Sequence, residues 1–125
     1  MEELVVFHAA DPGGAPGTLM GFDQVIALSL ELPAGRYVLH GRVQLMNMDG
    51  DRQNTSAGLR IRSSLAYPDN VDAYLTEYTS LTAPLQCVID LPEGDTIDLV
   101  VSTYAGYWEH ASVIAIAVDR LEPPL

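Results

Sequence analysis

The sequence feature that most constrains the fold is a strand–turn–strand pattern that occurs twice. Within residues 23–47, two segments of alternating apolar and polar residues flank the turn LPAG, and residues 85–102 repeat this arrangement around LPEG. Alternation with a period of two is typical of a strand that has one face in a core. Pro33 sets φ at the second turn position. Gly35 is expected to adopt the left-handed conformation that follows a type I turn and leads into a bulge. Two hairpins with matching turns predict an antiparallel all-β protein.

The same alternation assigns the faces of the first two strands. The residues that it places in the core are Ile26, Leu28, Leu30, Leu32, Tyr37, Leu39, Val43 and Leu45. The opposite face is mainly polar, but it also carries Met46 and Met48. We therefore expect the end of the second strand to be covered on both sides.

Turn residues and alternation divide the rest of the chain into further strands. The expected strands cover residues 3–9, 24–32, 36–47, 57–65, 73–79, 81–91, 96–103 and 110–121. Between them, AYPDNVD (residues 66–72) and YAGYWEH (residues 104–110) have the composition of loops. About eight strands in two antiparallel sheets of four predict a jelly-roll β-sandwich. The length of 125 residues fits one such domain over residues 1–125.

The last expected strand is apolar on both faces. Ile114, Ile116 and Val118 are predicted to face the core, and the opposite face carries the small apolar residues between them. A strand that is apolar on both faces is covered on both faces. Another copy of the chain is the natural cover in a single-domain protein, and a lid made by the chain's own loops is the alternative.

The charge balance excludes several classes of partner. The chain has 17 acidic and 6 basic residues and a net charge of −11. Binding of nucleic acid or of an anionic membrane surface needs a basic stripe, so neither is expected. No apolar run is long enough to span a membrane, and the acidic N-terminus does not fit a signal peptide. Localisation stays open between the cytoplasm and export by another route.

These segments resemble a known family. LSLELPAGRYVLHGRVQLMN, a strand ending near Cys87, LPEGDTIDLVVST and a closing ASVIAIAVDRL are similar to bacterial jelly-roll domains related to tumour necrosis factor and to the globular heads of complement-type collagen-like proteins. The likeness runs from Val25 to Leu121. It implies a jelly roll that assembles as a compact homotrimer and that binds a partner. The chain lacks the collagen-like or coiled-coil stalk of the family, so a free-standing trimer is expected.

An aromatic stretch before the last strand is the first candidate binding site. Its members are Tyr104, Tyr107, Trp108, Glu109 and His110, and Trp108 is the only tryptophan. Tyrosine and tryptophan beside a carboxylate can stack on a sugar ring or anchor a protein partner. Alternatively, Trp108 caps the end of the core or lies between subunits.

Four arginines form the second candidate. Arg36, Arg42, Arg60 and Arg62 lie on the predicted polar faces of two strands, which would form one basic patch if those strands were neighbours. Arginine binds carboxylates through a planar fork, so the patch would suit an acidic ligand or ion pairs between subunits. Solvated pairing with the surplus of acidic residues is the alternative.

Signals for metal binding and catalysis are weak. The loops around Asp49 and Asp69 offer oxygen ligands that calcium prefers, but neither has EF-hand spacing, and no cofactor is predicted. His8, His40 and His110 show no metal-binding spacing, and no nucleophile elbow or phosphate loop is present. Cys87 is the single cysteine and lies on the apolar side of its strand, which indicates a buried, inert thiol.

The sequence therefore predicts a non-enzymatic recognition or assembly module. We expect a homotrimer that binds a carbohydrate or protein ligand through loops at one end of the sandwich. The first alternative is a purely structural subunit of a surface, capsid or phage-tail assembly. The second is a small enzyme built on a sandwich fold, which only an analogy between folds supports.

Overall fold

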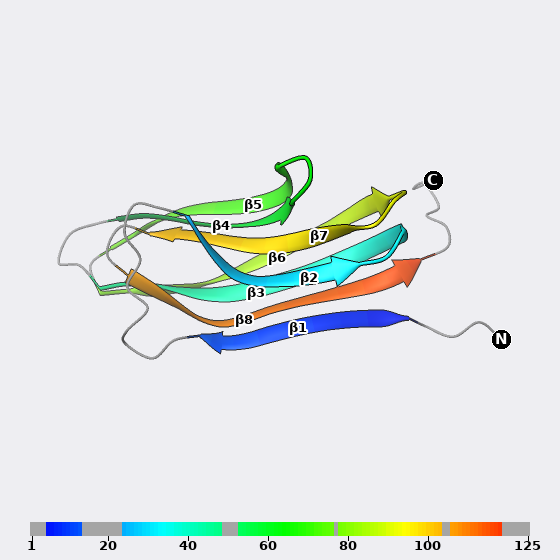
Figure 1. Cartoon of the computed structure of the whole chain (residues 1–125). Helices are drawn as coiled ribbons and strands as arrows, with labels where there is room; N and C mark the ends of the chain where they lie inside the picture. The colour runs from blue at the N-terminus through cyan, green and yellow to red at the C-terminus, as the bar shows by residue number, and fades with distance from the viewer. Residues whose placement is uncertain (1–4, 14–23, 49–52, 77, 104–105, 119–125) are drawn as a thin grey trace, which may run out of the picture.

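The computed structural model describes residues 5–13, 24–48, 53–76, 78–103 and 106–118, which form eight strands in two layers (Figure 1). The strands are β1 (Val6–Gly13), β2 (Val25–Leu32), β3 (Gly35–Asn47), β4 (Gln53–Ile61), β5 (Ala66–Leu75), β6 (Ser80–Leu91), β7 (Asp95–Thr103) and β8 (Gly106–Val118). They pair antiparallel throughout. The prediction of an all-β fold is confirmed.

The strand order is that of a jelly roll. Sheet A has the order β1-β8-β3-β6, and sheet B has the order β2-β7-β4-β5. The chain pairs the first strand with the last, the second with the seventh, the third with the sixth and the fourth with the fifth. It thus behaves as one long hairpin, closed between β4 and β5, that wraps into two sheets. The jelly-roll prediction is confirmed.

The two LPxG turns do not close hairpins, which corrects the sequence interpretation. β2 lies in sheet B and β3 in sheet A, so the turn LPAG carries the chain across the sandwich, and LPEG does the same between β6 and β7. A Cβ atom on Gly94 would lie 2.8 Å from the backbone oxygen of Leu32, so the two crossings are in close contact. A tight turn between two strands that each have one apolar face gives the same sequence pattern in both cases. The strands can pair within one sheet or lie in opposite sheets.

Backbone geometry differs between the two turns. Gly94 has φ of 78°, the left-handed conformation that glycine accepts without strain, and its amide donates to the Leu91 oxygen at 3.2 Å. Gly35 has φ of 159°, so the left-handed residue predicted there is absent. Instead, the Tyr37 hydroxyl donates to the Pro33 oxygen at 2.6 Å and fastens the LPAG crossing to β3.

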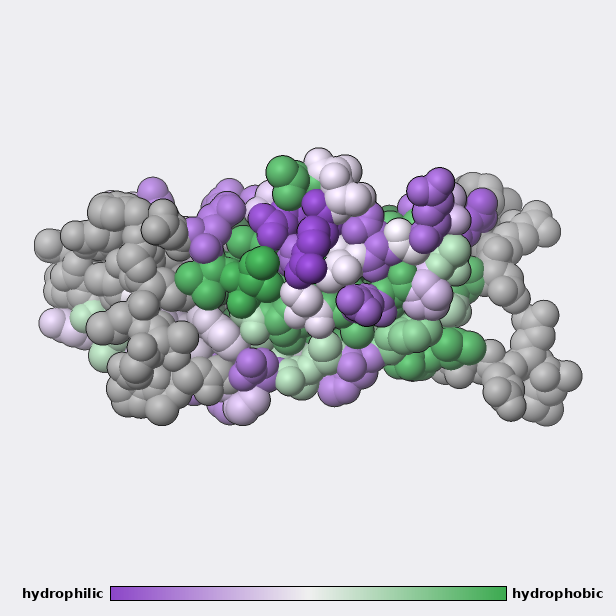
Figure 2. Space-filling model, in the orientation of Figure 1, coloured by the Kyte–Doolittle hydropathy of each residue, from purple (hydrophilic) through white to green (hydrophobic). Residues whose placement is uncertain are grey.

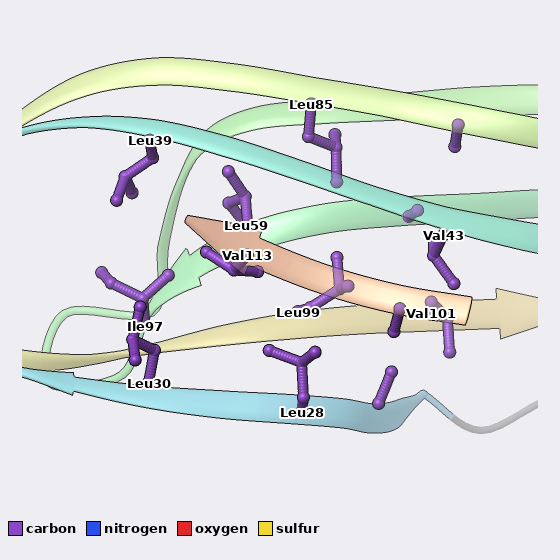
Figure 3. Close-up of a cluster of buried hydrophobic side chains, with 14 of the residues drawn as sticks. Leu28, Leu30, Leu39, Val43, Leu59, Leu85, Ile97, Leu99, Val101 and Val113 are labelled. Carbon is purple, nitrogen blue, oxygen red and sulfur yellow. The ribbon is translucent and has the colours of Figure 1, made fainter. Parts of the chain in front are cut away.

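The core lies between the sheets and is almost entirely aliphatic (Figure 3). Its fully buried members include Leu39, Leu45, Leu59, Ile97, Leu99 and Val113. Most predicted core residues of β2 and β3 are confirmed, but Ile26 is 46% exposed. A register shift between Ile26 and Leu28 inserts one residue, so Ala27 turns inward in its place.

The face assignment of the last strand is reversed. Val113 and Ala115 are fully buried in the core, whereas Ile114 points outward and is 37% exposed. Ile116 and Val118 lie on the same outer face as Ile114 and are half-buried. The larger side chains of residues 113–118 therefore face away from the core, contrary to the sequence prediction. Trp108 does lie in the core, and one extra residue of β8 opposite Arg42 and Gln44 reverses the faces between Trp108 and Val113.

Two predicted loops are strands. AYPDNVD belongs to β5, which covers Ala66–Leu75, and the aromatic stretch enters β8 at Gly106. The strand expected over residues 57–65 starts earlier, at Gln53, and ends at Ile61. Prolines and Asx residues led the prediction toward loops, but β5 is an edge strand, where proline is tolerated.

Candidate functional site

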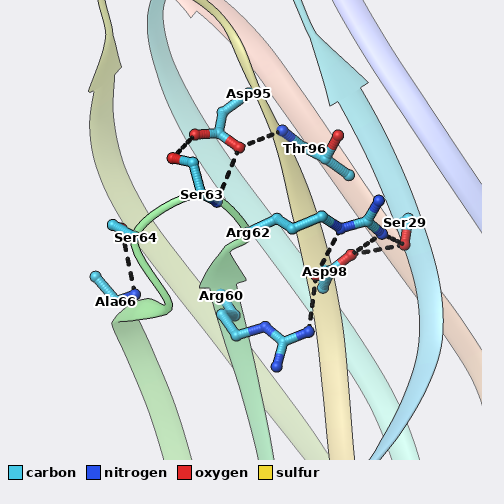
Figure 4. A network of polar contacts seen from close by, with 9 residues as sticks. All are labelled: Ser29, Arg60, Arg62, Ser63, Ser64, Ala66, Asp95, Thr96 and Asp98. Carbon is cyan, nitrogen blue, oxygen red and sulfur yellow. Dashed lines mark hydrogen bonds and ion pairs between the residues drawn. The ribbon is translucent and has the colours of Figure 1, made fainter.

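The outer face of sheet B carries a buried ion-pair network (Figure 4). Four hydrogen bonds converge on the carboxylate of Asp98 on β7. Arg62 donates through two nitrogens, Nη2 to Oδ1 at 2.6 Å and Nε to Oδ2 at 3.2 Å. Arg60 Nη2 donates to Oδ2 at 2.9 Å, and Ser29 Oγ donates to Oδ1 at 2.7 Å. The Asp98 side chain is fully buried although it points away from the core.

These contacts determine the charge of the group. Burial raises the pKa of Asp98, but the hydrogen bonds from Arg62, Ser29 and Arg60 outweigh it and hold the pKa below its usual value of 3.8. The hydrogen bond to Asp98 likewise raises the pKa of Arg60 and of Arg62. With all acceptor positions of Asp98 taken, the network is a structural clamp between β2, β7 and β4.

The four predicted arginines do not form one patch. Arg60 lies at the end of β4 in sheet B and Arg62 directly after it, and Asp98 engages both. Arg36 and Arg42 lie on β3 in sheet A, on the opposite side of the sandwich. The two strands are not neighbours, so the patch prediction is wrong. Whether any of these arginines binds an external ligand stays a prediction.

Arg36 and Arg42 differ in their surroundings. Arg36 Nε lies 3.4 Å from the Asp90 carboxylate in an exposed pair, which contributes little to stability. Arg42 makes no ion pair with any residue that the structure describes. It borders a surface cavity of about 410 Å³ together with Ala10, His110 and Ser112.

The aromatic stretch is part of strand β8, not of a loop. Trp108 is 5% exposed and belongs to the hydrophobic core, where it pairs in register with Leu45. Its indole therefore offers no exposed stacking surface, and Nε1 has no hydrogen-bond partner among the described residues. Tyr107 and Glu109 are half-buried on the outer side, and Tyr104 lies outside the described residues. A ligand role for this stretch stays a prediction that now rests on Tyr107 and Glu109.

The outer face of sheet A carries an apolar row that the sequence did not reveal. Val6 pairs with Ile116, Ile116 with Val38, and Val38 with Val88, so one β-branched residue from each strand forms a continuous line. Val6 is 48% exposed and Val88 is 51% exposed. In Figure 2, hydrophobic surface is visible around the start of β1 and the end of β8, on the right of the view. To find this row from the sequence, one would need to know which residues of each strand face outward and in which order the strands lie in the sheet.

Metal and thiol chemistry receive no support from the described residues. They contain no group of three or more His, Cys, Asp or Glu side chains that could hold a metal ion. Asp69, one of the proposed calcium ligands, accepts a hydrogen bond from the Gln86 amide at 2.8 Å and so caps the edge of β6. Burial, with a smaller effect from Asp69, raises the pKa of the Cys87 thiol to about 11, which disfavours the reactive thiolate.

Comparisons with known proteins agree on the fold. No protein-family model matches the sequence, and no curated protein matches it. A chain in the structure of infectious bursal disease virus Gx strain has a TM-score of 0.56 at 14% identity, covering 98% of this chain. The globular domain of zebrafish complement 1qA has a TM-score of 0.54 at 10% identity, covering 93% of this chain and 98% of that domain. Eiger, a tumour necrosis factor from S. frugiperda, has a TM-score of 0.51 at 10% identity, covering 99% and 98%.

These likenesses establish a jelly-roll fold shared with the complement and tumour necrosis factor domains. The chain spans about a third of the viral chain, at 35% of its length. At such low identity the likeness concerns the fold alone, and the resemblance to the bacterial members of this group stays a prediction. Among the described residues there is no helix long and apolar enough to cross a membrane.

Proposed function

We propose that the protein is a non-enzymatic module that assembles as a homotrimer through the outer face of sheet A. The observation that carries this proposal is the apolar row of Val6, Ile116, Val38 and Val88, which crosses all four strands. Ile114 and Val118 extend it along β8. A contiguous apolar surface of this kind on a soluble protein marks an interaction site.

The distribution of charge supports a second copy of the chain as the partner. The whole chain has a net charge of −11, which repels copies from one another at most contact surfaces. On the outer face of sheet A, Arg36 and Arg42 balance Asp90 and Glu109. Two copies can therefore approach through this face with less repulsion than through sheet B.

Recognition of a ligand is the second part of the proposal. Domains with the same fold include a complement globular domain and a tumour necrosis factor, and Tyr107 and Glu109 are accessible at one end of β8. We propose that a carbohydrate or protein ligand contacts them there. The alternative is a purely structural subunit, which the viral likenesses and the burial of Trp108 favour.

Solution mass tests the assembly. Analytical ultracentrifugation is expected to give three times the 13.5 kDa of the chain. Val88→Glu, at 51% exposure on sheet A, should shift the protein to monomer, because the charge would be buried at the interface. Ile26→Glu is the matched control at 46% exposure on sheet B and should leave the trimer intact. A monomeric wild type, or equal effects of both variants, would contradict the proposal.

A glycan array together with Tyr107→Ala separates recognition from a structural role. Binding that is lost in Tyr107→Ala would support the recognition site at the end of β8. Binding that survives in this variant would contradict that site. No binding by either protein would favour the structural subunit.

A further inference from the structure

We infer that the outer face of sheet B carries a binding groove for a neutral carbohydrate, between Tyr67 and Tyr74. This inference does not depend on assembly through sheet A, because the two outer faces lie on opposite sides of the sandwich (Figure 1). Its residues are also separate from the Tyr107 end of β8.

The groove lies across three strands. It is a cavity of about 350 Å³ lined by Asn54, Thr55, Ser56, Asp72 and Ser102. Ser56 on β4 pairs in register with Asp72 on β5 and with Ser102 on β7. Buried neighbours Thr55 and Ala57 face the core, so Ser56 faces outward, and the three side chains form one polar row.

The polar side chains of this row have no side-chain partners within the part of the chain that the structure describes. Among the described residues, no side chain donates to or accepts from the side chains of Asn54, Ser56, Asp72 or Ser102. Thr55 is different, since its hydroxyl donates to the Ala73 oxygen at 3.1 Å. A short distance along β7, all acceptor positions of Asp98 are occupied. On sheet B, the carboxylate of Asp98 thus has all its acceptor positions occupied. The row of Ser56, Asp72 and Ser102 is free to bind a ligand as far as the described residues show.

Two tyrosines bracket the open row. Tyr74 is 60% exposed and pairs in register with Asn54 at one end. Tyr67 is 39% exposed and lies on Gly58 at the other end. A Cβ atom at Gly58 would lie 2.8 Å from Cδ1 of Tyr67, so only glycine lets this ring lie against the strand. Asn54 and Gly58 are about 13 Å apart along an extended strand, which leaves room for a short oligosaccharide between the rings.

The combination of groups fits a neutral sugar. The apolar face of a sugar ring stacks on tyrosine, and its hydroxyls bond to carboxylate, amide and hydroxyl groups such as those of Asp72, Asn54 and Ser56. Among the described residues, Asp72 is the only charged side chain that lines the groove. With a net charge of −11 around it, an acidic ligand would be repelled.

NMR titration of the full chain labelled with nitrogen-15 tests the inference. The probes are the neutral trisaccharides maltotriose, cellotriose and triacetylchitotriose, with trigalacturonate as the acidic control. At least one neutral probe should shift amide signals within residues 54–58, 70–74 and 100–102, and trigalacturonate should not. No shifts with any neutral probe, shifts elsewhere on the chain, or equal binding of trigalacturonate would overturn the inference.

Variants locate the contact. Tyr74→Ala and Asp72→Asn, both at exposed positions, should weaken binding by about tenfold or more while the rest of the spectrum is retained. Tyr78→Ala removes a tyrosine that is 68% exposed but lies beyond the end of β5, whereas Tyr74 pairs in register with Asn54 of the groove, and Tyr78→Ala should bind as the wild type does. Equal losses in Tyr74→Ala and Tyr78→Ala would also overturn the inference. A monomeric protein that still shows the expected shifts would contradict the assembly proposal alone.

Discussion

The two outer faces of this sandwich differ in how their outward-facing side chains are shielded from solvent. On sheet B, the protein covers the outer side of β7 with its own side chains: Asp98 and Val100 point outward from β7, yet they are 0% and 4% exposed. Long side chains from β4 and the following turn fold over them, and Tyr67 lies on Gly58 beside Val100. On sheet A, the corresponding row is apolar, and Val6 and Val88 stay about half exposed.

The difference shows that an outward-facing position need not be a solvated one. The polar row around Asp98 on sheet B is satisfied within a single chain, because Arg60 and Arg62 reach an acceptor in their own sheet. Sheet A has short β-branched residues that cannot cover one another, and this exposed apolar surface is where we propose that a second copy of the chain binds. The predictions that follow test each half of this contrast.

Loss of Asp98 is expected to have the largest effect. Asp98→Ala removes the shared acceptor of Arg60, Arg62 and Ser29, and it leaves the partly buried Arg60 without its carboxylate partner. We expect the free energy of unfolding to fall by about 3 kcal/mol, measured by urea denaturation. Asp90→Ala, which removes the exposed pair with Arg36, is the matched control, with an expected loss below about 0.5 kcal/mol. Equal losses of stability in the two variants would show that the buried Asp98 network stabilises the fold no more than an exposed ion pair does.

The same network predicts a pH dependence. Because the pKa of folded Asp98 lies below 3.8, the unfolded chain binds more protons between the two pKa values, and stability falls as the pH drops through that window. Asp98→Asn cannot titrate at this position. The stability gap between wild type and Asp98→Asn should be constant above about pH 5 and narrow by about 1 kcal/mol per pH unit below the unfolded pKa. Urea denaturation at decreasing pH measures it, and a constant gap would contradict the lowered pKa.

Assembly through sheet A predicts a melting temperature that depends on protein concentration. Because only the folded chain associates, a tenfold rise in concentration should stabilise each protomer by about 1 kcal/mol and raise the melting temperature by a few degrees. Differential scanning fluorimetry over a dilution series measures this shift. Val88→Glu should abolish it and Ile26→Glu should retain it. A melting temperature that does not depend on protein concentration would contradict assembly through sheet A.

A glycine on sheet B gives the smallest expected effect. Gly58→Ala places a Cβ atom 2.8 Å from the Tyr67 ring, which must then move off the strand. Overpacking should cost about 1 kcal/mol of unfolding free energy, and the displaced ring should weaken binding of the neutral trisaccharides. Ser56→Ala on the same strand face is the control for stability, with almost no expected change. An unaffected Gly58→Ala protein would show that Tyr67 is not held against the sheet.

Some parts of this arrangement could be predicted from the sequence and others could not. The alternation in β3 correctly placed Tyr37, Leu39 and Val43 in the core, because a local period of two marks one apolar face. It failed at Ile26, where one inserted residue in the pairing with β7 reverses the faces. The arginine patch failed for a different reason, since Arg42 and Arg60 lie on strands of different sheets.

By itself, the sequence determined that the chain forms antiparallel strands, that their turns are tight, and that the second half of β8 is apolar on both faces. Only the tertiary structure decided that each LPxG turn crosses between sheets and that Val113 and Ala115, not Ile114 and Ile116, meet the core. A period of two divides a strand into two faces but does not say which is inner. That choice depends on the space left by the opposite sheet, whose strands are distant in the chain.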